Sequence, residues 1–266
     1  MEFTEEKINY WRTLSYWIDF ALAARQESKK CTVHNINGRN MVAYSQHGEE
    51  MDIIKNFMPK IDQVKDGTFV ELGGFDGITY SNTKGIEDAF GFSGVLIEPG
   101  DVFVAMDLNR PNTQNFRAAI STKPGEVEFT GLRGTATAGT TEKIIEATVN
   151  GPLDKDKKTK EIKKLEELSH AVPGATLSNI LQRSKLEYID LLCIDVEGSE
   201  LEVLKTMDWS IPVYIICIEM HSNDFRKDQQ KQIRKILKKQ GFTYKKTFHH
   251  DEFWINDAYF RKDQFV

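Results

Sequence analysis

The sequence has few cysteines and no long apolar run, and both shortages limit the classes of protein it can belong to. Three of its 266 residues are cysteine, and none shows the Cys-x-x-Cys spacing of a structural zinc site. Cys193 and Cys217 lie inside apolar runs, as buried free thiols do, so we expect a reducing compartment and a cytoplasmic location. No stretch has the roughly 20 apolar residues that span a bilayer, and the acidic, polar N-terminus is unlike a secretory signal.

An excess of positive charge is also missing. Lys and Arg together number 35, against 40 Asp and Glu, which gives a formal net charge of -5. Because nucleic-acid-binding proteins usually present a basic surface, no nucleic-acid partner is expected. A hydrophobic content of 40% over this length suffices for one large core, and the oligomeric state stays open.

The apolar spacing indicates an α/β protein with a helical region in front. Helical periodicity over residues 4–28 and 47–58 precedes the first convincing strand, so we predict a helical cap over residues 1–60 and a main domain over 61–266. Short apolar runs then alternate with helical stretches, which favours a parallel, doubly wound sheet. Strands are expected at 68–72, 94–97, 115–120, 188–194, 213–218, 242–248 and 253–260, and helices at 81–90, 101–109, 175–183, 199–207 and 224–240.

Residues 131–175 interrupt this alternation. Residues 135–141 are small and polar, and residues 154–160 are highly charged. We interpret the stretch as a partly mobile insertion over the sheet edge. Its basic run could contact a phosphate or a polymer, but such runs are more often a solvated surface.

A glycine-rich turn follows the first strand of the main domain. Within Phe69–Gly77, glycines stand at 73, 74 and 77, where they allow positive φ and a close approach of ligand to backbone. Ligands of open α/β sheets bind at such strand ends. The spacing differs from the G-x-G-x-x-G of dinucleotide sites, and the carboxylates of Glu71 and Asp76 would repel a pyrophosphate. They would suit the ammonium group of S-adenosylmethionine (AdoMet), and Glu98, ending the next strand, could accept both ribose hydroxyls.

Acidic residues also follow two later strands. Asp195 and Glu197 come directly after the strand at 188–194, and Glu219 and His221 follow the strand at 213–218. The loop at residues 249–251 should reach the same sheet edge. Two chemistries are open for this group: a divalent metal such as magnesium or manganese held by oxygen and imidazole ligands, or a general base for a hydroxyl nucleophile.

Several motifs occur together in one order along the chain. They are Tyr44–Glu50, Phe69–Gly77, Tyr80–Thr83, Gly94–Pro99, Asn109–Pro111 and Ile194–Leu204. In these motifs the chain resembles the FkbM family of AdoMet-dependent methyltransferases, over about residues 44–125 and 175–260. Family members commonly carry Asp where this chain has Glu50 and Glu71.

The resemblance implies a class I, Rossmann-like methyltransferase fold, with a seven-stranded, mostly parallel sheet whose last hairpin is antiparallel. It also implies O-methylation of a small-molecule or glycan hydroxyl. By resemblance, Glu71, Gly73 and Gly77 would line AdoMet, Glu98 would hold the ribose, and Asp195 and Glu197 would lie at the active centre.

The residues and the resemblance together yield three sets of predicted site residues. Predicted AdoMet contacts are Gln46, Glu71, Gly73, Gly74, Asp76, Gly77, Ser81, Asn82, Glu98 and Asp195; predicted catalytic residues are Asp195, Glu197 and His221; predicted metal ligands are Asp195, Glu219 and His221. Two alternatives remain. One is an NAD-dependent sugar-modifying Rossmann enzyme, against which the glycine spacing argues. The other is a catalytically inactive methyltransferase-like binding subunit, which fold analogy alone does not exclude.

Overall fold

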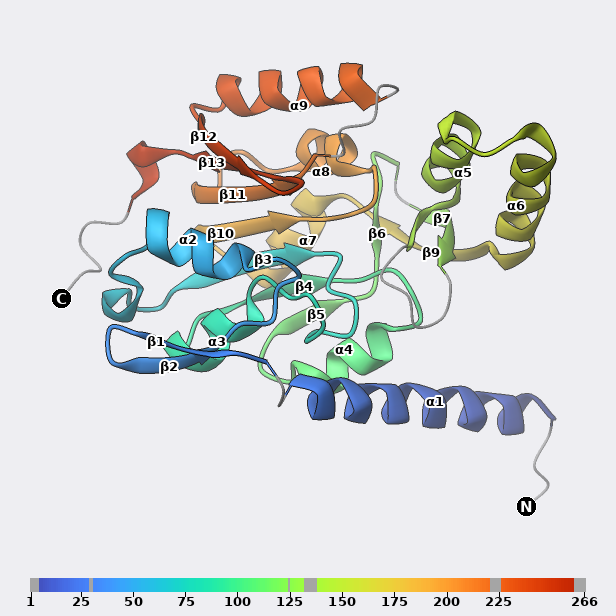
Figure 1. Cartoon of the computed structure of the whole chain (residues 1–266), viewed down its shortest axis with the longest axis horizontal. Helices are drawn as coiled ribbons and strands as arrows, with labels where there is room; N and C mark the ends of the chain where they lie inside the picture. The colour runs from blue at the N-terminus through green and yellow to red at the C-terminus, as the bar shows by residue number, and fades with distance from the viewer. Residues whose placement is uncertain (1–4, 29–30, 124, 132–137, 221–225, 261–266) are drawn as a thin grey trace.

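A seven-stranded mixed sheet runs through the centre of the structure, a computed structural model that describes residues 5–28, 31–123, 125–131, 138–220 and 226–260. Its strands are β3 (Thr68–Leu72), β4 (Ser93–Ile97), β5 (Gln114–Phe116), β10 (Ile189–Ile194), β11 (Val213–Glu219), β12 (Thr243–Phe248) and β13 (Asp251–Ile255). They lie in the order β12-β13-β11-β10-β3-β4-β5 (Figure 1). β3, β4, β5, β10 and β11 pair in parallel, whereas β13 is antiparallel to both of its neighbours. The predicted α/β sheet with its reversed last hairpin is confirmed.

Helices cover both faces of this sheet because its central strands are apolar on both sides. Every residue of β10 is buried, which is typical of a parallel strand between two helical layers. One layer contains α7 (Leu177–Ser184), α8 (Glu200–Thr206) and α9 (Lys227–Lys239), packed against alternate residues such as Val70 and Leu192. The other contains α2 (Glu49–Phe57), α3 (Lys84–Phe90) and α4 (Phe103–Asn109), packed against Phe69 and Leu191.

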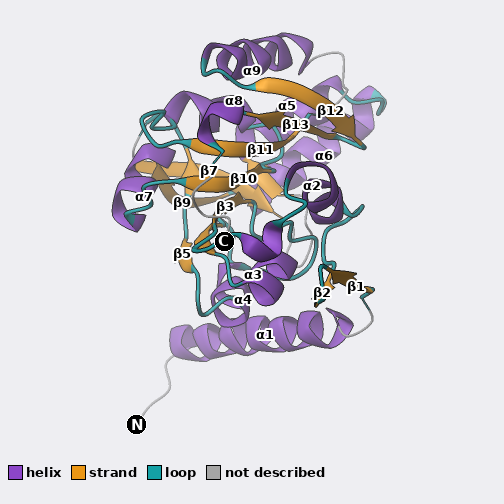
Figure 2. Ribbon diagram, turned by 90° about the vertical axis from the view of Figure 1, so that its left-hand side faces the viewer, coloured by secondary structure: helices purple, strands orange, loops and turns teal. Residues whose placement is uncertain are grey.

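The N-terminal region contributes a long helix and a hairpin. Helix α1 (Glu5–Ser28) packs along α4, with Trp17 and Ala21 buried against Val102 and Ala105. It lies at the opposite end of the molecule from α9 (Figure 2). The hairpin of β1 (Val33–Ile36) and β2 (Arg39–Val42) is an addition to the predicted elements. No helix in the described ranges is long and apolar enough to cross a membrane.

Both predicted N-terminal helices are confirmed. The second of them, α2, shares a buried cluster with Phe69 of the central sheet, so it packs as part of the main core. The proposed domain boundary near residue 60 stays a prediction.

Most of the insertion that the structure describes is regular secondary structure, whereas residues 132–137, part of the stretch expected to be mobile, lie outside the described residues. The expected strand at 115–120 is wrong as a single element, because β6 (Ala119–Ile120) leaves the main sheet and pairs with β9 (His170–Ala175). Together with β7 (Gly125–Gly131) and β8 (Ala138–Thr140) these form a second, four-stranded sheet. Val127 and Phe129 pack with Ala119 and Val172 in the core of this sheet, which explains why so polar a stretch folds.

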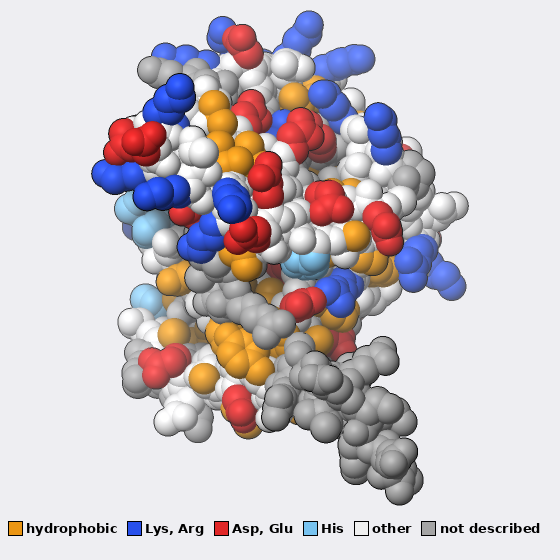
Figure 3. All heavy atoms as spheres, turned by 90° about the vertical axis from the view of Figure 1, so that its right-hand side faces the viewer, with side chains coloured by type: hydrophobic (Ala, Val, Ile, Leu, Met, Phe, Trp, Pro, Cys, Tyr) orange, Lys and Arg blue, Asp and Glu red, His pale blue; other side chains and the backbone are white. Residues whose placement is uncertain are grey.

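Two helices complete the insertion, α5 (Thr141–Asn150) and α6 (Lys155–Leu168). The charged run begins α6, where Asp154 caps the helix by accepting a hydrogen bond from the backbone N–H of Lys157. Exposed ion pairs such as Lys163 with Glu167 line the helix. Acidic and basic side chains are interspersed on the face that includes this region (Figure 3), as expected of a solvated helix surface.

Candidate active site

A cavity of about 630 Å³ lies where the carboxyl ends of the central strands meet. Gly73, Glu98, Asp195 and Glu219 line it from the ends of β3, β4, β10 and β11. Other parts of the chain complete the wall, with Trp17 from α1, Gln46 and Tyr80 from loops, and Phe129, Thr140 and His170 from the four-stranded sheet. Its volume falls in the range of small-molecule sites, roughly 300–1,000 Å³.

The glycine turn is shaped by a close approach of two backbone segments. Gly73 has a φ of 79°, and the N–H groups of Gly73 and Gly74 donate to the carbonyl oxygen of Ile97 at 3.0 and 3.1 Å. A Cβ atom at position 73 would lie 1.9 Å from the carbonyl oxygen of Asp195. The prediction that glycine is needed here for a close ligand approach is therefore incomplete, because the neighbouring strand end already demands it.

Glu98 is held rigidly at the cavity wall. Its Oε1 accepts a hydrogen bond from the N–H of Gly100 at 2.7 Å, and its Oε2 accepts one from the N–H of Phe75 at 3.1 Å. Burial raises the pKa of Glu98 to about 7, although both backbone donors act in the opposite direction. A carboxylate has about four lone-pair sites, so these two bonds leave acceptor capacity for a ligand.

An acidic centre formed by Asp195, Glu197 and Glu219 lies beside the glycine turn, and all three residues line the cavity. Asp195 is exposed to the cavity. Desolvation by the surrounding protein groups, followed by repulsion from Glu219, Glu197 and Asp251, raises the pKa of Asp195 above its usual range. The three predicted carboxylates therefore do converge.

The backbone around this centre is unusual. Glu197 has a φ of 52°, which is uncommon for a residue other than glycine, and Gln229 of α9 donates to the carbonyl oxygen of Gly198 at 2.7 Å. The backbone N–H of Met220 donates to the carbonyl oxygen of His250 at 2.7 Å. The turn between the last two strands therefore reaches this edge, as predicted.

The predicted metal site is incomplete in the structure. Asp195 and Glu219 adjoin, but His221 lies outside the described residues. Over the ranges that the structure describes, no three His, Cys, Asp or Glu side chains are grouped so that they could hold a metal ion. The metal therefore stays a prediction.

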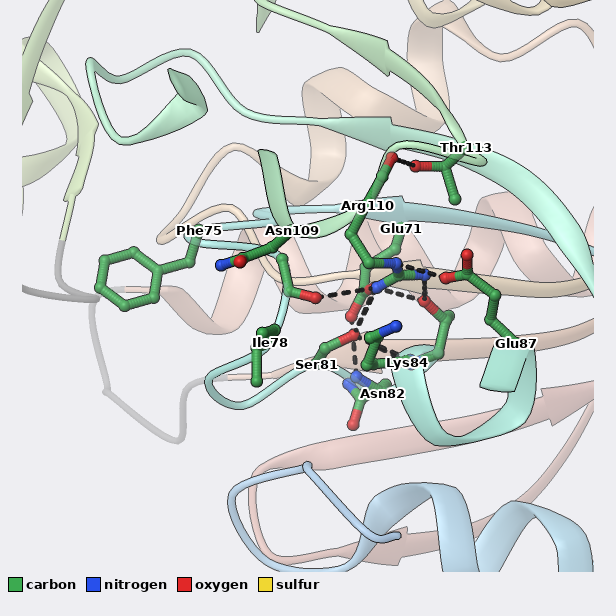
Figure 4. A network of polar contacts seen from close by, with 12 residues as sticks. Glu71, Phe75, Ile78, Ser81, Asn82, Lys84, Glu87, Asn109, Arg110 and Thr113 are labelled. Atoms are coloured by element: carbon green, nitrogen blue, oxygen red, sulfur yellow. Dashed lines mark hydrogen bonds and ion pairs between the residues drawn. The ribbon is translucent and has the colours of Figure 1, made fainter. Parts of the chain in front are cut away.

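Glu71 is committed to a buried polar network rather than to the cavity. Its carboxylate accepts hydrogen bonds from the hydroxyls of Ser81 and Thr83 and from the N–H of Asn82. The fully buried guanidinium of Arg110 lies 3.8 Å from Glu71 and also pairs with Glu87. Figure 4 shows these groups gathered around Arg110.

A second predicted carboxylate, Asp76, is used in the same way. It accepts hydrogen bonds from the N–H groups of Ile78 and Thr79 and from the hydroxyl of Thr79, at 2.7–2.8 Å. The expectation that both carboxylates meet the cofactor ammonium finds no support in this geometry, because protein donors already occupy them. The predicted contacts that do not line the cavity are Glu71, Gly74, Asp76, Gly77, Ser81 and Asn82.

Two residues that the sequence did not single out carry unsatisfied nitrogens at the cavity wall. Trp17 is 2% exposed, and its Nε1 has no hydrogen-bond partner in the described structure. The Nε2 atom of His170 is also buried and has no hydrogen-bond partner among the described residues. Both belong to segments with no recognisable motif, so only the tertiary structure brings them to the site.

A known protein family matches most of the chain. The family model described as the methyltransferase FkbM domain matches residues 71–244. Among solved structures, the crystal structure of a fibrillarin/Nop5p complex matches with 14% sequence identity and a TM-score of 0.36, covering 84% of this chain and 95% of that chain. No curated protein matches significantly in sequence.

Proposed function

This chain belongs to the FkbM methyltransferase family, and on that premise we propose that it transfers a methyl group from AdoMet to a hydroxyl oxygen of a sugar, glycan or related small acceptor. Methyl transfer with AdoMet follows from the family. The nature of the acceptor and the choice of oxygen are the proposal, and the cavity chemistry supports both.

The acidic centre is the observation that carries the proposal. A sugar hydroxyl is a weak nucleophile at neutral pH, so a base that takes its proton helps the reaction. A carboxylate with a raised pKa is a stronger base than an ordinary carboxylate, and the surroundings of Asp195 raise its pKa. In the proposed step, the acceptor oxygen bonds to the methyl carbon, the carbon–sulfur bond breaks, and the hydroxyl proton passes to Asp195.

The same carboxylates favour a cationic ligand. AdoMet carries a sulfonium charge, which the methyl transfer removes, so a site lined by carboxyl groups favours the binding of AdoMet over that of its product. Glu98 would accept hydrogen bonds from the ribose hydroxyls, and Gly73 and Gln46 would border the methionine part. Glu71 and Asp76 would act indirectly, by holding the loop between β3 and α3.

The lining of the cavity supports a neutral polyhydroxyl acceptor. Amide, hydroxyl and carboxylate groups border it, from Gln46, Thr140, Ser199 and Glu219, and these can both donate to and accept from sugar hydroxyls. No Lys or Arg in the described part of the chain lines it. An acceptor rich in phosphate would find no cationic side chain among these residues and would be repelled by the carboxylates, so we expect neutral glycans to be preferred over nucleotide sugars.

The test is mass spectrometry of methyl transfer from AdoMet with a deuterated methyl group, against a panel of neutral glycans and nucleotide sugars. We expect a labelled ether on a glycan hydroxyl. Asp195→Asn should lower turnover by roughly 10²–10⁴-fold, the usual contribution of a general base, and change the affinity for S-adenosylhomocysteine (AdoHcy) far less. Exposed Glu187 provides the matched control, Glu187→Gln, which should keep full activity.

Two outcomes would contradict the proposal. Full turnover in Asp195→Asn would remove the base assignment. Tight AdoHcy binding without transfer to any hydroxyl would favour the inactive binding subunit instead.

A further inference from the structure

His170, the first residue of β9, brings an unsatisfied acceptor to the cavity wall. Its Nδ1 lies 3.3 Å from the carbonyl oxygen of Leu168. A carbonyl oxygen can only accept, so this contact is a hydrogen bond when Nδ1 carries the proton, and in that neutral imidazole Nε2 is left as an acceptor. This Nε2 is buried and has no partner in the part of the chain that is described. Buried polar atoms nearly always have partners, so a missing one indicates a group that binds there.

The contacts of His170 place it near Glu98. Its strand partner is Phe129, with the two ring centroids 6.0 Å apart and the rings nearly perpendicular. Phe129 in turn packs over the backbone beside Glu98, because a Cβ atom on Gly100 would lie 3.4 Å from Phe129 Cε1 and 2.9 Å from Glu98 Oε1. His170 is therefore linked through Phe129 to the wall where we place the ribose.

The far side of the insertion faces the acidic centre instead. A Cβ atom on Gly139 would lie 3.4 Å from the Cβ of Glu197. If Glu98 holds the ribose and the methyl group lies beside Asp195, the nucleobase extends past Glu98 in the other direction. That direction leads to Gly100, Phe129 and His170.

We infer that the Nε2 atom of His170 accepts a hydrogen bond from the exocyclic amino group of adenine, so that the insertion of this chain selects the base of the cofactor. This inference rests on the proposed ribose role of Glu98. A base with an oxygen atom at the 6-position would bring that acceptor next to the Nε2 acceptor of His170, and no hydrogen bond could form between them. The imidazole could not adapt by moving its proton to Nε2, because a lone pair on Nδ1 would then face the carbonyl oxygen of Leu168.

The experiment compares two ligands by titration calorimetry: AdoHcy and S-inosylhomocysteine, which differs in carrying a 6-oxo group. Wild-type protein should prefer AdoHcy by about tenfold or more, because a site built around one hydrogen bond rejects an analogue that lacks it. His170→Phe keeps a ring against Phe129 but removes the acceptor, so this variant should bind the two ligands with about equal affinity. His170→Gln supplies an amide oxygen and should restore part of it. His34→Phe, in the distant β1 strand, is the matched control and should behave as wild type.

The outcomes separate the inference from the proposed function. Binding of AdoHcy with an unchanged preference in His170→Phe overturns the inference while leaving the cofactor site intact. Unchanged binding of both ligands with loss of methyl transfer also overturns it, because His170 would then contact the acceptor. Failure of wild-type protein to bind AdoHcy would refute the proposed function itself. Thermal unfolding of each variant verifies that it is folded.

Discussion

Replacing Glu98 by Gln should change the pH dependence of stability in a direction opposite to the usual behaviour of carboxylates. Burial raises the pKa of Glu98 from 4.5 to about 7 in the folded protein. Folding therefore favours the protonated form. At pH values below 4.5, the pKa of Glu98 in the unfolded state, the group does not lower the free energy of unfolding. This free energy falls as the pH rises from 4.5 towards 7, and the full loss is reached above the folded-state pKa of about 7.

The size of this cost follows from the shift. One pKa unit corresponds to about 1.36 kcal/mol, so the full penalty is roughly 3 kcal/mol, of which about 2.5 kcal/mol develops between about pH 5 and pH 8.5. The amide of Glu98→Gln does not ionise, so the variant does not show this pH-dependent loss of stability. It has one acceptor oxygen for the N–H groups of Gly100 and Phe75, so the variant loses about 1–3 kcal/mol at every pH.

Urea unfolding of both proteins from pH 5 to 8.5, without cofactor, measures the effect. Other raised carboxyl groups such as Glu50 and Asp195 contribute to both curves and cancel in the difference. We expect the stability of Glu98→Gln relative to wild type to rise by about 2.5 kcal/mol across this range. Parallel curves would refute the reasoning, because they would mean that the carboxylate stays solvated in the folded state. The affinity for AdoHcy can be measured in the same buffers. It should increase in wild-type protein as the pH rises through about 7, and it should not change with pH in Glu98→Gln.

Three further changes test other parts of the structure. Arg110→Met leaves the carboxylates of Glu71 and Glu87 buried without their cation and should cost about 3–5 kcal/mol in urea unfolding; a loss below about 1 kcal/mol would contradict the network. Gly73→Ala places a Cβ atom 1.9 Å from a backbone oxygen and should prevent stable folding. The control Gly91→Ala has a similar positive φ and no atom within 4 Å, so thermal unfolding should show only the cost of a Cβ atom in the left-handed region, about 1–2 kcal/mol. Exhaustive chelation tests the metal: full activity in chelator leaves the acidic centre as a base without metal, and loss that magnesium or manganese restores supports the metal-assisted centre.

The sequence by itself determined the sheet and the positions of its strand ends. Apolar runs such as Ile189–Ile194, alternating with helical stretches, are typical of parallel strands buried between two layers of helices, and the polar residues that follow such strands then lie at the ligand-binding edge. Gly73, Glu98 and Asp195 could be predicted for this reason, since their places depend on local pattern and on a general rule of parallel sheets.

Tertiary structure decided which polar groups are left for a ligand. Glu71 follows the same rule as Glu98 and even resembles a cofactor contact, but Arg110, the residue that follows α4, pairs with it. His170 has no motif, yet the pairing of β9 with β7 brings it to the cavity. A pattern of apolar residues reports which side chains are buried. It does not report which distant donors and acceptors meet, because the energy of each polar group depends on partners that only the folded chain brings within hydrogen-bond distance.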